Sequence, residues 1–470
     1  MVYVGPLLGD CVDCTLNTLI FKTKYQVEIL AGHYPPKLWI RGPAGSGKTV
    51  LLLEKVETLA SDILGRQIDE NILVLCFNSA LCKMLEKTLN ARLAKRFPAE
   101  KDVSSLLHFK TFAKLIMKVT GLSQPPSSNN EKERAVSMAL KQLLERTSPF
   151  YRKYDHIFVD EGQDLYGPSK WPELLEQMHK SSVVDHNKDA ELEVLQKSGF
   201  FWVMFDINQY LYFSKERLQS LAAYLKNSAQ LNKVLRNTGN IFEQSKKYFR
   251  SLMPQGSAIK LGHHESGLQI KWDDSLASTD VEEEEGVQAI VPHLTDLQRQ
   301  KVRARDICVL VQNQTKQGKL MDALPIKTQT ADQLVTENDD FMVVESIRRF
   351  KGLESKVVIL YNPPFEDISS NKEMLYTAVS RCFCYLIVIT TPGGCKALQS
   401  IQGIQGTSKQ YNPTHPEFYR KRPNEERGES ERVFFPVDNL SREDENNQSY
   451  WPSVPKQAKN SEPSPMEVDE

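Results

Sequence analysis

The chain has 470 residues, with 59 Lys and Arg against 60 Asp and Glu, 40% apolar side chains and 25% charged side chains. This length predicts two or three domains, each able to bury a core. The net charge of −1 excludes a globally basic footprint, so any contact with nucleic acid must use a local patch.

Features of the sequence also bear on its compartment. No run of 18 apolar residues occurs, and the start MVYVGPLLGDCVDC lacks the positive region of a signal peptide. Eight cysteines in so long a chain do not indicate a disulfide framework. Cys11 and Cys14 form a C-x2-C pair without a partner pair at zinc spacing, which favours reduced thiols over a metal site. We expect a soluble intracellular protein of the nucleus or cytoplasm, with no membrane contact.

Residues 1–25 form an N-terminal extension, and residues 26–230 alternate short apolar runs with helical patterns. The strands predicted in this block are residues 38–40, 72–77, 156–160 and 201–205. Nearly continuous apolar strands between helices predict an α/β domain whose parallel sheet is covered on both faces.

A second alternating block, residues 231–400, predicts another parallel sheet. Its expected strands are residues 307–311, 341–346, 356–361 and 384–390. The acids Glu282 to Glu285 are predicted to form a solvated first helical turn. Residues 401–470 are rich in Pro, Ser, Glu and Asn, which predicts a disordered tail, whose end PMEVDE either docks a protein partner or has no role.

The segment GPAGSGKT follows an apolar strand and precedes a helical pattern, as a phosphate-binding loop does. Its glycines let successive backbone N–H groups face one anion at a helix start. Lys48 is expected to reach the terminal phosphates, and the Thr49 hydroxyl to ligate Mg²⁺. The residues predicted to bind nucleotide here are Gly42, Pro43, Ala44, Gly45, Ser46, Gly47, Lys48 and Thr49.

The segment VDEGQD directly follows another apolar strand. Asp160 at the strand end can hold Mg²⁺ through water, and Glu161 can take a proton from an attacking water. An acidic loop cap is the alternative, which the pairing with a phosphate loop disfavours. Arg236 and Arg381 are the candidates to neutralise charge on a γ-phosphate.

Together these segments resemble the motor core of the UvrD/PcrA/Rep-like branch of superfamily 1 helicases. The resemblance spans residues 26–381 as dispersed motifs in the family's order. It also includes the DExQD form of the acidic motif. The motifs are GPAGSGKT, ILVLCFNSALCKML, HFKTFAKL, VDEGQD, FDINQYLY, LNKVLRNTGNIF, RARDICVLVQNQ, VESIRRFKGLESKVVIL and LYTAVSR. The helicase-like region of long Schlafen proteins is a second family that the chain resembles.

The resemblance implies two RecA-like P-loop NTPase domains, residues 26–230 and 231–400, that bind ATP and Mg²⁺ between them. Gln26 would read adenine, Gln209 would sense the γ-phosphate, Glu354 would hold ribose, and Gly352 would let the backbone approach. The implied catalytic set is Lys48, Glu161, Gln209, Arg236 and Arg381.

The implied partner is single-stranded nucleic acid, with DNA preferred to RNA. Tyr212 would stack on a base, and Lys83 and Lys110 would contact the backbone. Leu235 and Ser214 replace aromatic residues of the family pattern, and Phe205 replaces a glycine. The short spacing between motifs leaves no room for the insertion subdomains that grip duplex.

These observations predict an ATPase that couples hydrolysis to binding of, or translocation on, a single strand, with 3′–5′ helicase activity as its extension. The alternative is a nucleotide-gated nucleic-acid-binding or scaffold protein without processive unwinding. A P-loop kinase is disfavoured, because the KGLE and YTAVSR segments have no role in one. The nucleic acid, polarity, unwinding, pathway, oligomeric state and completeness of the chain stay open.

Overall fold

The computed structural model describes Leu8 and residues 22–97, 103–165, 170–180, 199–209, 228–249, 259–279, 283–333 and 340–401. Tyr212, Ser214, the Cys11–Cys14 pair and the predicted tail from residue 402 lie outside these described residues. The described part is an α/β structure with two six-stranded parallel sheets, as the sequence predicts.

The first sheet has the strand order β3-β2-β4-β5-β1-β6, and neighbouring strands pair in parallel. Its strands are β1 (Lys37–Arg41), β2 (Ile72–Cys76), β3 (Leu107–Thr111), β4 (His156–Val159), β5 (Phe201–Phe205) and β6 (Ala229–Gln230). Since all strands run the same way, their carboxyl ends and the loops that follow β1, β4 and β5 meet at one edge.

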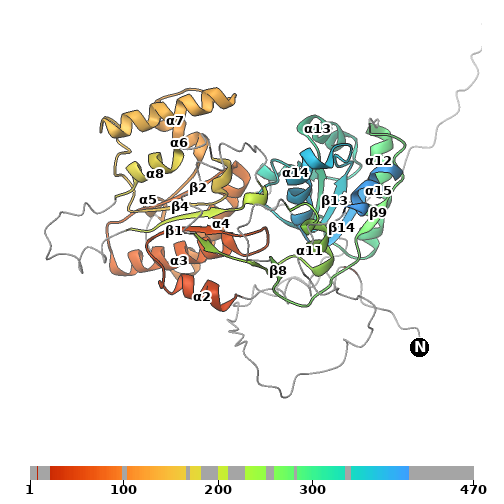
Figure 1. The fold of residues 1–470 in the computed structure, drawn as a ribbon, viewed down its shortest axis with the longest axis horizontal. Coiled ribbons are helices and arrows are strands. Elements are labelled where there is room, and N and C mark those ends of the chain that lie inside the picture. The colour runs from red at the N-terminus through yellow and green to blue at the C-terminus, as the bar shows by residue number, and fades with distance from the viewer. Residues whose placement is uncertain are drawn as a thin grey trace, which may run out of the picture.

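Helices cover both faces of this sheet (Figure 1). They are α2 (Lys24–Leu30), α3 (Lys48–Arg66), α4 (Ser79–Arg96), α5 (Val103–Leu106), α6 (Phe112–Thr120), α7 (Asn129–Leu144) and α8 (Trp171–Met178). Strand side chains alternate between two cores: Ile72 and Val74 pack with α2, α3 and α4, whereas Leu73 and Leu75 pack with α6, α7 and α8. The predicted coverage of both faces is therefore confirmed.

The second sheet has the order β11-β12-β10-β13-β14-β9, again with parallel neighbours. Its strands are β9 (Lys271–Asp273), β10 (Ile307–Val311), β11 (Thr328–Gln329), β12 (Met342–Ser346), β13 (Ser355–Tyr361) and β14 (Cys382–Ile389). Strands β7 (Lys233–Val234) and β8 (Lys260–Leu261) form a separate pair. We call the two sheets with their helices the first and second lobes.

The second lobe also has a core on each face of its sheet. Its helices are α11 (Gly239–Lys246), α12 (Glu283–Arg299), α13 (Gln314–Ala323), α14 (Ile368–Ser380) and α15 (Pro392–Ser400). Helices α11, α14 and α15 pack in one core, and α12 and α13 in the other. Helix α12 begins at Glu283, so acids fill its first turn as predicted.

Three predicted strands extend one residue too far at their carboxyl ends, where the structure ends them at Cys76, Val159 and Ile389. Strands β3, β6, β7, β8, β9 and β11 were not predicted. All except β3 have only two or three residues, which is too short for a period to show. Strand β3 lies at a sheet edge, and its sequence LHFKT has His108 and Lys110 on either side of Phe109, so it lacks the apolar run of a central strand.

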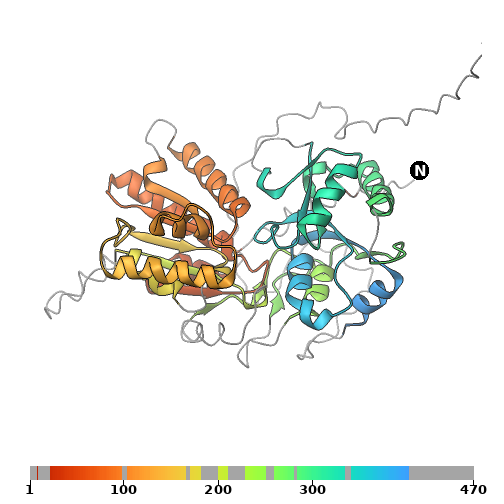
Figure 2. The same cartoon turned by 90° about the horizontal axis from the view of Figure 1, so that it is seen from above.

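The two lobes lie side by side and contact each other (Figures 1 and 2). Ala44 and Ala80 of the first lobe join a core of the second lobe. The predicted boundary between residues 25 and 26 falls inside α2, and the boundary at residue 230 falls at the end of β6. Among the described residues, none of the helices is sufficiently long and apolar to span a bilayer.

Candidate active site between the two lobes

The loop between β1 and α3 is held in a shape that requires glycine. Gly45 and Gly47 have positive φ angles of 72° and 85°. A Cβ on Gly47 would lie 2.6 Å from Nε2 of Gln26, and a Cβ on Gly45 would lie 2.2 Å from Oδ1 of Asn237. The loop is therefore packed between α2 and the segment after β7, with its backbone preceding the first turn of α3.

Lys48 is buried at the start of α3. Its Nζ donates to the carbonyl oxygens of Gly42 and Pro43 at 2.8 and 2.9 Å, and lies 4.0 Å from a carboxylate oxygen of Asp206. The ammonium group is thus folded over its own loop, where an incoming phosphate can replace the two carbonyl contacts.

Thr49 and Asp160 provide adjacent oxygen ligands. The Thr49 hydroxyl donates to Oδ2 of Asp160 at 2.8 Å. Burial, and then the neighbouring Glu161 charge, raise the pKa of Asp160 to about 6. Within the described ranges no cluster of three or more His, Cys, Asp and Glu side chains could hold a metal. The pair fits Mg²⁺, which takes few protein ligands and keeps several waters.

Glu161 is the buried carboxylate beside this pair, in a left-handed conformation with φ of 55°. Burial raises the pKa of Glu161, but the positive charges of Lys351, Arg381 and Lys48 outweigh it and lower the pKa overall. Glu161 therefore stays ionised at neutral pH, as a general base must. Three cations from two lobes converge on this one carboxylate.

Lys351 is a buried cation that the sequence did not single out. Its Nζ pairs with the carboxylate of Asp164, donates to the carbonyl oxygen of Gln209, and lies 4.0 Å from Oε2 of Glu161. The lysine comes from the second lobe, and all three partners come from the first. Two signals were available in the sequence. Lys351 opens the KGLE segment, and Asp164 is an acid after an apolar strand, which needs a cation when it is buried.

Arg381 and Arg236 approach from the second lobe. Arg381 is buried at the end of α14, where it donates to the carbonyl oxygens of Thr377 and Leu353 at 3.3 and 3.2 Å. Arg236 forms an ion pair with Glu354. Burial and the charge of Arg381 lower the pKa of Arg236 to about 9, which leaves it protonated at neutral pH.

Tyr376 links α14 directly to the loop between β1 and α3, the predicted phosphate loop of residues 42–49. Its hydroxyl accepts from the backbone N–H of Ala44 at 2.7 Å and lies 3.3 Å from a carboxylate oxygen of Asp206. Gln209 donates to the same carboxylate at 2.7 Å. The Asp206 carboxylate thus contacts a phenol from the second lobe and an amide from the first lobe. Tyr376 is a second residue that the sequence did not single out.

Two further predicted residues have protein contacts in this structure. Glu354, expected at ribose, pairs with Arg236. Gly352, expected at the nucleotide, has φ of 81°, and a Cβ there would lie 2.6 Å from Leu81 of α4. Its close backbone approach is therefore to the first lobe.

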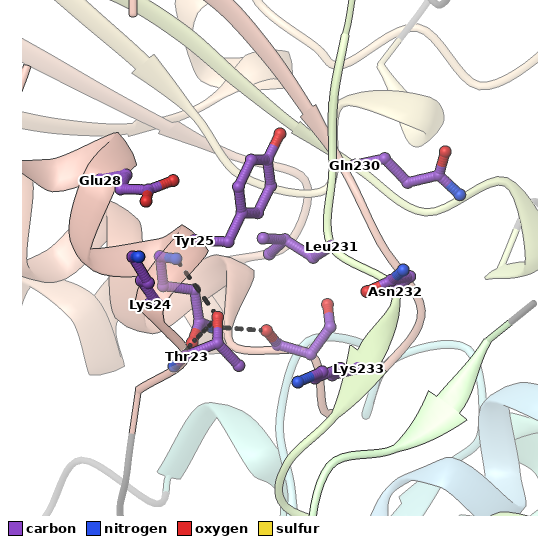
Figure 3. A pocket seen from close by; sticks show the side chains of 10 residues that line it. Thr23, Lys24, Tyr25, Glu28, Gln230, Leu231, Asn232 and Lys233 are labelled. Atoms are coloured by element: carbon purple, nitrogen blue, oxygen red, sulfur yellow. Dashed lines mark hydrogen bonds between the residues drawn. The ribbon is translucent and has the colours of Figure 1, made fainter. Parts of the chain in front are cut away.

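A cavity of about 480 Å³ lies beside the phosphate loop and is shown in Figure 3. Helix α2 forms one side of it, and the segment after β6 forms the other. Its lining residues are Thr23, Lys24, Tyr25, Gln26, Glu28, Ser46, Gln230, Leu231, Asn232 and Lys233. Gln26 donates from Nε2 to the Ser46 carbonyl oxygen at 2.9 Å, which ties α2 to the phosphate loop.

The lysines predicted to contact nucleic acid lie on neighbouring elements, α4 and β3. Lys83 is exposed and donates to the backbone carbonyl of Asp332 at 3.2 Å. Burial, then the charges of Lys118 and Lys153, lower the pKa of Lys110. Lys118 and Lys153 are therefore close enough to Lys110, on the edge strand β3 of the first sheet, to act on its charge.

No protein-family model matches this chain. Among solved structures, the chain is similar to the C-terminal domain of a possible DNA helicase from Lactobacillus plantarum WCFS1. The identity is 17% and the TM-score is 0.27, and the match covers 36% of this chain and 93% of that one.

Proposed function

We propose that this protein is a nucleic-acid-dependent ATPase of the UvrD-like helicase type, with two RecA-like lobes. The observation that carries the proposal is the convergence on Glu161 of Lys48 from the first lobe with Arg381 and Lys351 from the second. A phosphate loop, a buried carboxylate base and cations from a separate lobe are the components that cleavage of a phosphoanhydride needs.

Each of these side chains has a separate role in the proposed hydrolysis of ATP. Lys48 leaves its two carbonyl contacts to bind the terminal phosphates, and Glu161 accepts a proton from the attacking water. Thr49 and Asp160 would hold Mg²⁺, which neutralises charge on the β- and γ-phosphates when bound. Arg381 and Arg236 stabilise the charge that develops on the γ-phosphate.

Hydrolysis is coupled to closure of the lobes because the arginines come from the second lobe. An arginine supplied across a cleft is worth about 10³–10⁵ in turnover. Single-stranded nucleic acid lying across both lobes would favour the closed arrangement. Contacts from Lys83 and Lys110 to phosphates do not depend on base sequence. The expected partner is therefore a single strand of any sequence.

ATP turnover with and without single-stranded DNA or RNA tests the proposal. We expect stimulation by a single strand, stronger with DNA, and loss of turnover in Lys48→Ala and Glu161→Gln. Lys141→Ala, at an exposed ion pair on α7, is the control and should hydrolyse ATP like the wild type. Normal hydrolysis by Glu161→Gln would contradict the assignment of the base.

A second candidate is a nucleotide-gated scaffold that binds a strand without turning over ATP. It is favoured by the contacts of Lys48, Arg236 and Arg381, which all have acceptors from the protein itself. Such a protein would bind ATP and a single strand, yet show no stimulated hydrolysis. The same assay therefore separates the two candidates.

A further inference from the structure

The cavity beside the phosphate loop is lined by the buried side-chain amide of Gln26. The oxygen of this amide has all of its hydrogen bonds filled, whereas the nitrogen does not. Oε1 of Gln26 accepts from the backbone N–H of Thr23 at 2.7 Å and from the Thr23 hydroxyl at 3.1 Å. A carbonyl-type oxygen has two acceptor positions, so both are filled. Nε2 has two hydrogens, and one of them is donated to the Ser46 carbonyl oxygen. Among the described residues the other hydrogen has no acceptor.

Gln26 can therefore give a base one donor and no acceptor. Adenine and guanine share N7, an acceptor, and differ at the neighbouring exocyclic group, which donates in adenine and accepts in guanine. A bidentate contact that distinguishes the two purines needs the oxygen as well as the nitrogen of the amide. With its oxygen engaged by Thr23, Gln26 can contact N7 of either purine.

The cavity also provides an apolar surface for a flat ring. Tyr25 packs against the apolar core that contains Leu231, and both side chains line the cavity on its two sides (Figure 3). The ring of Tyr34 meets Tyr25 edge-on at 5.9 Å, which supports its position. Leu235, the residue that replaces the family's aromatic group, is buried and is not part of the lining. Stacking on Tyr25 is sequence-tolerant, because every base has a flat apolar face.

We propose that this cavity binds the base of a purine nucleoside triphosphate through N7 and stacking on Tyr25, without distinguishing ATP from GTP. The inference rests on the proposed function, since it presumes that the phosphate loop binds a triphosphate. The proposed substrates are therefore the purine nucleoside triphosphates, GTP as well as ATP, and not the pyrimidine nucleotides.

Equilibrium binding of ATP, GTP, CTP and the 7-deaza forms of both purine triphosphates tests it on the unmodified full chain. We expect the Kd values of ATP and GTP to agree within about fivefold, the worth of a single hydrogen bond. Loss of the N7 acceptor in the 7-deaza nucleotides should raise both Kd values by about fivefold. CTP, which lacks N7, should also bind more weakly than either purine.

Thr23→Ala gives a second, opposite readout. Removing the hydroxyl frees one acceptor position on Gln26, so the variant should come to prefer ATP over GTP by about fivefold. Ser128→Ala is the matched control, because Ser128 forms the same capping box at the start of α7, which contributes nothing to the cavity. Each variant loses one helix cap, but Ser128→Ala should leave the ratio of the two Kd values unchanged.

Strong preference of the wild type for ATP, by about thirtyfold or more, would overturn the inference while leaving the proposed function intact, since such a ratio exceeds one hydrogen bond. Equal affinity for the natural and 7-deaza purines would overturn it as well. If no triphosphate binds, or if Lys48→Ala binds all of them like the wild type, the proposed function itself fails and the inference falls with it.

Discussion

Lys351 is a buried residue of the second lobe whose contacts are all with the first lobe. It is fully buried, and so is its partner Asp164, whose pKa burial raises to about 6 although Lys351 opposes that shift. A buried ion pair adds little stability over apolar residues, but removal of one partner leaves an uncompensated charge. Removal of Lys351 alone should therefore lower the free energy of unfolding by more than the ion pair adds relative to two apolar residues.

Lys351→Met keeps the length of the side chain and removes its charge. We expect a fall in the free energy of unfolding of about 3–5 kcal/mol, because Asp164 loses its buried partner. We also expect slower ATP turnover, because Glu161 loses the cation that does most to keep it ionised. Urea unfolding and ATP hydrolysis provide the measurements. Lys141→Met, at the exposed ion pair with Glu145 on α7, should stay within about 0.5 kcal/mol of the wild type. An equal effect of both variants would contradict the burial of the Lys351–Asp164 pair as the cause.

Tyr376 provides a second test of the contacts between the lobes, with a smaller expected loss of stability. Tyr376→Phe removes the hydroxyl that accepts from Ala44 N–H and leaves this backbone donor in the phosphate loop without it, at a cost of about 1–3 kcal/mol. Turnover should fall because the loop is less well positioned. Tyr248→Phe is the control, since it also removes a buried phenol hydroxyl. Among the described residues this hydroxyl accepts from Nε2 of Gln244 at 2.9 Å, a contact within the second lobe. Both variants lose stability, and a loss of turnover in both would remove the special role of Tyr376.

At the scale of elements, the central strands were predictable because burial on both faces makes them apolar runs. The edge strands β3 and β11 were not predicted. Strand β3 contains polar residues, and β11 has only two residues. The same distinction applies to the site. Lys48 and Asp160 stand in motifs whose spacing indicates their role. Lys351 and Tyr376 stand in the KGLE and YTAVSR segments, but their partners lie 187 and 332 residues away, and the local sequence does not indicate such pairs.

The connection from α8 to the first sheet contains a titratable core residue, His179, which meets the ring of Phe201 edge-on at 5.7 Å. Burial lowers the pKa of His179 from 6.5 to about 4 in the folded protein. Between these two pH values the unfolded chain binds the proton and the folded chain does not. The contribution of His179 to stability is therefore complete above about pH 6.5 and declines toward pH 4, at about 1.4 kcal/mol per pH unit.

His179→Leu should remove this part of the acid sensitivity. We expect the free energy of unfolding of the variant to fall less steeply than that of the wild type between pH 6.5 and pH 4, by about 1.4 kcal/mol per pH unit. Urea unfolding at a series of pH values gives the two slopes, so any constant cost of the substitution cancels. His33→Leu, at an exposed position, should follow the wild type. Identical slopes for His179→Leu and the wild type would contradict the burial argument.

At the scale of the whole molecule, the lobes also meet on the side of α4, away from the phosphate loop. Asp332 of the second lobe accepts from the Ser79 hydroxyl at the start of α4 and pairs with Arg349. Lys83 donates to the backbone carbonyl of Asp332. The Asp332 carboxylate thus stands between Arg349 of the second lobe and Lys83 of the first lobe. We propose that a single strand bound across both lobes brings a phosphate to these two cations.

Asp332→Asn should therefore raise the affinity for single-stranded DNA. The substitution keeps the shape of the side chain and removes the negative charge that competes with phosphate for Arg349 and Lys83. A charge at this range near the surface is worth about 0.5–1 kcal/mol, so the Kd should fall about two- to fivefold at low salt. The gain should shrink as salt rises, because screening weakens exposed charges. Fluorescence anisotropy with a labelled oligonucleotide measures both effects. Asp62→Asn removes an acid paired with Arg66 on the exposed face of α3 and should leave the Kd unchanged; an equal gain in this control would show that net charge alone, and not the site between the lobes, determines the affinity.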